Sequence, residues 1–129
     1  MQVVHHPRYL VWFEVARTDW FRALGMAYRD VMESGTHLAV IEVGVRHLRP
    51  ARYDDEVVVE TRCTEVGGAS VTLTYVVRRG ADVLATGFTR LGAIETSGRA
   101  KRMPPEMRSR FLAVLEPQET GAPGVQPEA

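Results

Sequence analysis

Cysteine is almost missing from this sequence, with Cys63 as its single example. One cysteine excludes an internal disulfide framework and any metal site built from several thiolates. Since small extracellular domains commonly depend on disulfides, the scarcity favours the cytoplasm. Cys63 also continues an alternation of inward-facing apolar residues, so we expect a small core residue rather than a nucleophile.

The sequence also has no excess of either charge and no long apolar run. The 129 residues carry 16 basic and 16 acidic side chains, which argues against a general nucleic-acid binder. No apolar run approaches the ~20 residues that span a bilayer, and residues 1–8 have no signal-peptide pattern. We therefore expect one globular domain at 1–115 and, because residues 116–129 are rich in proline and glycine, a disordered tail there.

The strongest helical pattern covers residues 9–24. Pro7 suits the first turn of this helix and Gly25 suits its end. A shorter helix is predicted at 27–33. The apolar side chains on one half of the long helix are Tyr9, Leu10, Trp12, Phe13, Ala16, Trp20, Phe21, Ala23 and Leu24. An apolar arc of this width needs a large partner surface, such as the concave face of a sheet.

After Gly35 the apolar period changes to two, which is typical of strands. The four predicted strands lie at 39–46, 56–63, 71–78 and 83–95. Their connections are too short for helical crossovers, so the later pairs are antiparallel. A modest helix follows from Pro104-Pro105 to Leu115. The expected class is therefore α+β, with one long helix wrapped by an antiparallel sheet.

Three strings extend this reading: VVHHPRYL at 3–10, WFEVAR at 12–17 and VRHLRPARYDDE at 45–56. With the order of elements, they resemble the hotdog fold from about residue 2 to 95. The 4-hydroxybenzoyl-CoA thioesterase-like branch, which includes the thioesterases associated with the Tol–Pal system, is the most similar. The resemblance implies hydrolysis of acyl-CoA to acid and CoA, without cofactor or metal. It also implies a homodimer or homotetramer with active sites between subunits.

The sequence departs from that family at its start. The family's catalytic Asp would fall about two residues ahead of Met1, and the family's first strand is also missing from this chain. Either the recorded start is an internal Met or the carboxylate is truly lost, and we favour the first. We expect the chain as given to be inactive or slow, and an extended chain with the Asp to be active.

The segment at residues 5–9 is the candidate catalytic end of the helix. A helix N-terminus offers unpaired N–H groups to an oxyanion. By family position the backbone N–H near His6 polarises the thioester carbonyl, and the His6 imidazole orients substrate or water. Alternatively, His6 is only a helix-entry residue. The resemblance places His5, Pro7 and Tyr9 beside the substrate. A metal at His5-His6 is not expected, because adjacent residues do not converge on one ion.

Charged residues supply the remaining candidates. Glu14 and Arg17, three apart on the helix, either contact the substrate in an acyl pocket or form a buried ion pair, which we favour. Arg49 and Arg52 lie in a loop that is either structural, which we favour, or in contact with a CoA phosphate. The turn at 65–70 has no basic residue, so the CoA nucleotide is either held weakly or held elsewhere, with Arg78 and Arg79 or Lys101 and Arg102 as the candidates. The alternative for such strand-end arginines, which we favour, is that they are only solvated.

The leading hypothesis is an acyl-CoA thioesterase acting through a carboxylate and the helix N-terminus. The rival is a non-catalytic hotdog module that binds acyl thioesters or serves as an oligomeric partner. A hotdog hydratase would need an Asp/His pair in a longer motif, which is not found. Trp12, Phe13 and Trp20 suit an apolar or aromatic acyl group, but core packing explains them equally well.

Overall fold

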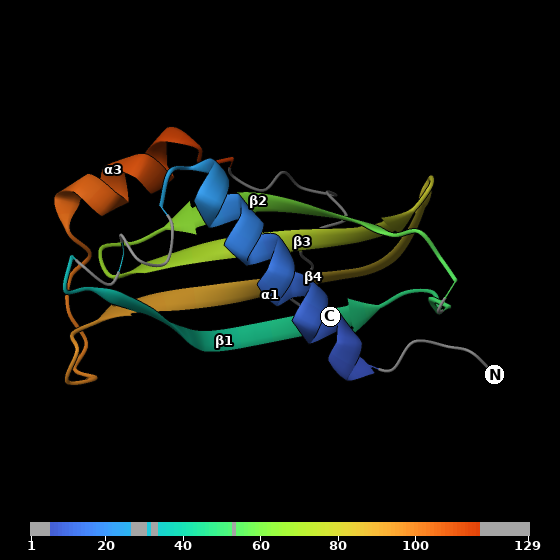
Figure 1. The fold of residues 1–129 in the computed structure, drawn as a ribbon, viewed down its shortest axis with the longest axis horizontal. Helices are drawn as coiled ribbons and strands as arrows, with labels where there is room; N and C mark the ends of the chain where they lie inside the picture. Colours follow the sequence, from blue (N-terminus) through green and yellow to red (C-terminus); the bar gives the residue numbers. More distant parts are fainter. Residues whose placement is uncertain (1–5, 27–30, 32–33, 53, 117–129) are drawn as a thin grey trace.

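A computed structural model describes residues 6–26, 31, 34–52 and 54–116 (Figure 1). Its elements are α1 (His6–Ala23), β1 (His37–His47), β2 (Val58–Val66), β3 (Ser70–Arg79), β4 (Asp82–Ile94) and α3 (Pro105–Ala113). The predicted long helix, the four strands and the last helix are confirmed in that order. Of the short helix predicted at 27–33, only Val31 is described, and it is helical. The predicted tail lies almost wholly outside the described residues.

The four strands form one antiparallel sheet in the order β1-β4-β3-β2, so β1 and β2 are its edges. Helix α1 runs diagonally across one face of this sheet, and α3 lies near the C-terminal end of α1 (Figure 1). The rings of Trp20 and Phe111 stack with centroids 6.1 Å apart, which joins the two helices. No described helix combines the length and apolarity needed to cross a membrane.

The helix α1 begins in the segment HHPR and ends before Gly25. Gly25 adopts a φ of 76°, a left-handed conformation that glycine tolerates at the end of a helix. Within the helix, Phe13 is 1% exposed and stacks on Tyr75 of β3 with ring centroids 4.4 Å apart. This aromatic pair fastens the middle of α1 to the centre of the sheet.

Gly87 of β4 sets how closely α1 approaches the sheet. A Cβ atom at this position would lie 2.5 Å from the ring of Phe13 and 2.7 Å from the carbonyl oxygen of Gly44. Both distances are far below a normal van der Waals contact. The missing side chain therefore makes the space that the Phe13 ring occupies.

A β-bulge in β1 changes which residues face α1. The register with β4 shifts between Val40 and Glu42, so Ile41 has no partner of its own. The extra residue interrupts the inward–outward alternation predicted across 39–46. Residues before the bulge point to the opposite face of the sheet from the one that this alternation predicts. As a result Val40 lines the space beside α1, while Ile41 packs against Gly92.

Part of the apolar arc predicted for α1 is not buried. Leu10 is 45% exposed, and Ala23 is exposed as well. On the side of the helix where Leu10 lies, the sheet ends at its edge strand β1, so the sheet does not cover Leu10. An apolar strip of α1 therefore borders an open groove beside β1.

Cys63 is a core residue, as predicted. It is fully buried, and its Sγ lies 4.0 Å from the carbonyl oxygen of Phe111 in α3. Burial raises the pKa of this thiol to about 11. A thiol with that pKa is protonated at neutral pH, which argues against a role as a nucleophile.

Candidate functional site

The N-terminal turn of α1 starts at His6 and contains no acidic side chain. The first N–H groups of a helix have no partner within the helix, and the helix dipole places positive potential there. No carboxylate of the first turn neutralises this potential. Only the backbone of His6 and Pro7 belongs to the described structure, and His5 lies outside it. The roles predicted for these three residues stay predictions.

Tyr9, in this N-terminal region, packs beneath the loop that follows β1. It is 2% exposed, and its ring contacts the ring of His47 edge-on with centroids 4.8 Å apart. Burial raises the pKa of the Tyr9 phenol, and the charge of Asp55 raises it further, although the backbone of Ala51 and the charge of Arg79 act in the opposite direction. Tyr9 thus ties the start of α1 to this loop, and its contact with substrate stays a prediction.

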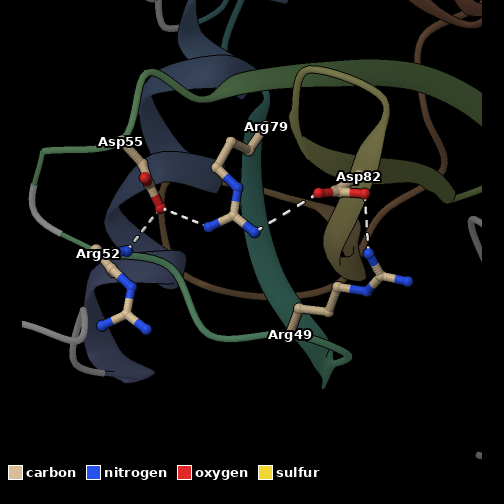
Figure 2. A network of polar contacts seen from close by, with 5 residues as sticks. All are labelled: Arg49, Arg52, Asp55, Arg79 and Asp82. Carbon is tan, nitrogen blue, oxygen red and sulfur yellow. Dashed lines mark hydrogen bonds and ion pairs between the residues drawn. The ribbon is translucent and has the colours of Figure 1, made fainter.

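Charged residues at this end of the sheet form one network (Figure 2). Arg79 lies between two carboxylates, with Nη1 3.0 Å from Oδ2 of Asp55 and Nη2 3.7 Å from Oδ2 of Asp82. Asp82 also pairs with Arg49 at 2.9 Å. The backbone N–H of Arg52 donates to Oδ2 of Asp55 over 2.8 Å. Asp55 thus caps a backbone N–H of the loop at 49–55, as the structural interpretation predicts, and contact of this loop with CoA stays a prediction.

The four arginines assigned to CoA therefore differ in their surroundings. Arg49 and Arg79 belong to the network, and Arg78 pairs with Glu60 over 2.8 Å. Arg52 is exposed, and its guanidinium has no ion-pair partner among the described residues. Figure 2 shows this guanidinium turned away from the two carboxylates. Arg52 is the member of the set whose charge is most available to a phosphate.

We expect Asp55→Asn to lower the midpoint of urea unfolding at pH 7. The backbone N–H of Arg52, and then Arg79, hold the pKa of Asp55 below its ordinary value of 3.8. A lowered folded-state pKa stabilises the fold above that ordinary value, and the contribution is lost as the pH falls through the folded-state pKa.

The difference between Asp55→Asn and the wild type is thus expected to shrink as the pH falls below the ordinary pKa of 3.8 and on through the lower folded-state pKa. Asp54→Asn is the matched control, since it removes an exposed neighbouring carboxylate that is outside the network. A difference that persists unchanged in acid would contradict the assignment.

Two cavities lie in the groove between α1 and the β1 side of the sheet. The first, of about 280 Å³, is lined by Glu14, Arg17, Thr18, Phe21, Met26, Val31, His37, Leu38, Val40 and Leu91. The second, of about 270 Å³, is lined by Leu10, Val11, Phe13, Glu14, Arg17, Val40, Val43 and Thr89. They share three lining residues and so form one groove along the helix. Its walls are mainly apolar, as in most small-molecule sites.

Glu14 and Arg17 line both cavities. Glu14 is exposed and Arg17 is half-buried, and no ion pair joins them in the described part of the chain. The favoured prediction of a buried ion pair is wrong, because this side of α1 faces the groove and not the packed sheet. The alternative, that Glu14 lines a pocket, agrees with the geometry.

No three histidine, cysteine, aspartate or glutamate side chains within the described residues gather as metal ligands would. His37 is half-buried, and its Nε2 lies 3.3 Å from Oγ1 of Thr96.

Two groove residues, Thr89 and Val40, were not predicted from the sequence. The signal for Thr89 was a polar residue in the inward-facing positions of its strand, and the β-bulge concealed Val40.

Comparison with known proteins identifies the family. The sequence model of a protein family, the thioesterase superfamily, matches residues 1–86, which is more than half of the chain. The chain belongs to this family.

Named relatives and a solved structure agree with this family assignment. A Bacillus subtilis protein called putative acyl-CoA thioesterase YneP is 32% identical over 75 residues, covering 58% of this chain and 54% of YneP. The chain thus matches about half the length of that relative. Acyl-CoA thioesterase YbgC of Haemophilus influenzae is 29% identical, covering 84% of this chain and 82% of its own.

The crystal structure of the hypothetical protein TT1821 from Thermus thermophilus matches with a TM-score of 0.81 and 34% identity, covering 88% of each chain. These comparisons confirm the predicted α+β hotdog fold. The narrower assignment to the branch associated with the Tol–Pal system stays a prediction.

Proposed function

We propose that this protein hydrolyses acyl-CoA thioesters to a free acid and CoA. The observation that carries the proposal is the position of the N-terminal turn of α1, which adjoins the apolar groove. Leu10, which lines the groove, lies one turn beyond His6. A thioester carbonyl at the start of the helix would therefore have a sheltered channel for its acyl group directly beside it.

The backbone N–H near His6 acts on the carbonyl oxygen. As water or a carboxylate attacks the carbonyl carbon, negative charge develops on that oxygen, and the N–H stabilises it by a hydrogen bond. The helix dipole adds to this stabilisation. Collapse of the tetrahedral intermediate breaks the carbon–sulfur bond and releases the CoA thiol.

Attack also needs a carboxylate to activate water or to act as nucleophile. Glu14 lies eight residues beyond His6, about 12 Å along the helix axis, which is too far to serve a carbonyl held at the helix start. The resemblance assigns this role to an Asp at a position ahead of Met1. Each assay of activity therefore includes an upstream-extended protein, to which a segment bearing this Asp is added ahead of Met1.

CoA is anionic, and the end of the sheet near Tyr9 carries the arginines suited to it. We assign a CoA phosphate to the available guanidinium of Arg52, with Arg49 as its neighbour.

Exposed Val40, Ile41 and Val43 on the edge strand β1 support the proposal of a homodimer or homotetramer that covers them. The single cysteine supports the cytoplasm as the compartment.

Release of free thiol from short aliphatic, long aliphatic and aromatic acyl-CoA esters tests the function. We expect steady turnover of at least one group by the upstream-extended protein. Arg52→Ala is expected to raise KM for acyl-CoA while leaving hydrolysis of a short thioester without the nucleotide unaffected. Tight binding of acyl-CoA without turnover would support the rival non-catalytic module. Neither turnover nor binding would overturn both.

A further inference from the structure

Tyr9 holds the start of α1 against the rest of the protein. Among residues 8–23 of the helix, whose side chains are described, Tyr9 is the first that is buried, and its neighbours Arg8 and Leu10 are exposed. The next buried side chain is Phe13, about one turn further on. The orientation of the N-terminal turn therefore depends on the groups that hold Tyr9.

The end of β1 and the loop after it hold Tyr9. The ring of His47, the last residue of β1, contacts the Tyr9 ring edge-on with centroids 4.8 Å apart. The Tyr9 hydroxyl forms a hydrogen bond with the backbone of Ala51, a loop residue that is 1% exposed. Loss of this bond would leave a buried hydroxyl unpaired, which costs free energy. The position of Ala51 therefore determines where Tyr9 lies.

Asp55 holds the loop backbone next to Ala51. Its Oδ2 accepts a hydrogen bond from the backbone N–H of Arg52, the residue after Ala51, over 2.8 Å. The same oxygen lies 3.0 Å from Nη1 of Arg79 at the end of β3. Figure 2 shows the carboxylate facing both of these donors. Asp55 therefore joins the loop backbone to the sheet.

We propose that Asp55 is a positioning residue for thioester hydrolysis, because it fixes the loop that holds Tyr9 and thereby the N-terminal turn of α1. The proposal rests on the proposed function and adds a residue to its site. Two hydrogen bonds joined by one stretch of backbone connect the carboxylate to the helix. Catalysis is sensitive to the geometry that this path controls, since a misplacement of about 1 Å can cost about 100-fold in rate.

The loop has a second attachment, at its start. The backbone N–H groups of Leu48 and Arg49 donate to the carbonyl oxygen of Leu84 over 2.8 Å and 3.0 Å. Loss of the Asp55 carboxylate leaves these bonds in place and releases only the part of the loop around Ala51. We therefore expect a displaced helix start rather than an unfolded loop.

Kinetics of Asp55→Ala in the upstream-extended protein test the proposal. We expect kcat for thiol release to fall about tenfold, with acyl-CoA and with a short thioester that lacks the nucleotide. KM for the short thioester is expected to stay unchanged, because the groove keeps its contacts. Asp55→Asn keeps an oxygen that can accept from Arg52, so its loss is expected to be smaller. Glu60→Gln is the matched control. It breaks the ion pair with Arg78, 2.8 Å long and outside the loop, and is expected to leave kcat unchanged.

A double-mutant cycle with Tyr9→Phe tests the path to the helix. This variant removes the hydroxyl that bonds to Ala51, and we expect a loss of kcat similar to that of Asp55→Ala. Because both changes act on one path, the double variant is expected to lose no more than the worse single variant. Losses that multiply would overturn the proposal. A normal kcat in folded Asp55→Ala would do so as well, even with a raised KM for acyl-CoA, since that result would assign the loop to CoA binding.

Hydrogen exchange separates this proposal from the proposed function. Backbone amides at residues 8–12 are expected to exchange faster in Asp55→Ala than in wild type or Glu60→Gln, because the helix start is held less firmly. If the upstream-extended wild type hydrolyses no acyl-CoA, the proposed function fails, and exchange still reports whether Asp55 holds the start of α1. Equal exchange in all three proteins overturns the role assigned to Asp55.

Discussion

His6→Pro is expected to lower kcat for acyl-CoA hydrolysis about 100-fold, the effect typical of losing one oxyanion donor. Proline has no backbone N–H, so the substitution removes the group proposed to stabilise the developing negative charge. The first turn of a helix tolerates proline, because its N–H groups have no partner within the helix. The fold is therefore expected to survive, as thermal unfolding would verify.

His6→Ala is the matched control for that experiment. It removes the imidazole and keeps the backbone N–H, so we expect kcat to fall by less than about tenfold. Both variants are made in the upstream-extended protein and assayed by thiol release. An equal loss in the two variants would assign the effect to the imidazole. No loss in either would place the reacting carbonyl away from the start of α1.

Gly87→Ala is expected to lower the free energy of unfolding by about 3 kcal/mol, the upper part of the usual range for overpacking a core. The new methyl group would lie 2.5 Å from the Phe13 ring and 2.7 Å from the backbone oxygen of Gly44. The ring has its own partner in Tyr75, and the oxygen belongs to a strand. Removing these two close contacts therefore requires α1 to move away from the sheet, and this movement would also displace the N-terminal turn of α1.

Gly92→Ala on the same strand is the control for Gly87→Ala. Its methyl group would meet only the side chain of Ile41, at 3.3 Å, and that exposed side chain is free to adjust. Neither glycine has a positive φ, so the comparison isolates steric contact from backbone strain. Urea unfolding of both variants measures the difference. Equal losses would show that the close approach of Phe13 is not what Gly87 provides.

The order and type of the elements were predictable from local patterns. A period of 3.6 apolar residues identified α1, and a period of two identified the four strands, because each geometry repeats its facing at that interval. The observed α1 begins three residues before the predicted position 9, since Pro7 belongs to its first turn. Gly25 ended the helix where predicted, because its left-handed conformation is a local property.

The candidate site was predictable only in part. The strings at 3–10 and 45–56 indicated that the start of the helix, and the loop that packs on Tyr9, belong to the site. The groove was not predicted, since it depends on β1 lying at the edge of the sheet and on a bulge at Ile41. The pairing of Arg79 with Asp55 was also missed, because these residues come together only when the turn after β3 meets the loop after β1.

The sequence by itself thus determined the fold class, the end of α1 at Gly25 and the burial of Cys63, since periodicity and backbone preference act over a few neighbouring residues. Tertiary structure alone decided which side of α1 stays uncovered and which arginines pair with carboxylates from another segment. Those outcomes depend on contacts between segments distant in the chain, such as Phe13 with Gly87 and Arg79 with Asp55. No local pattern records such contacts.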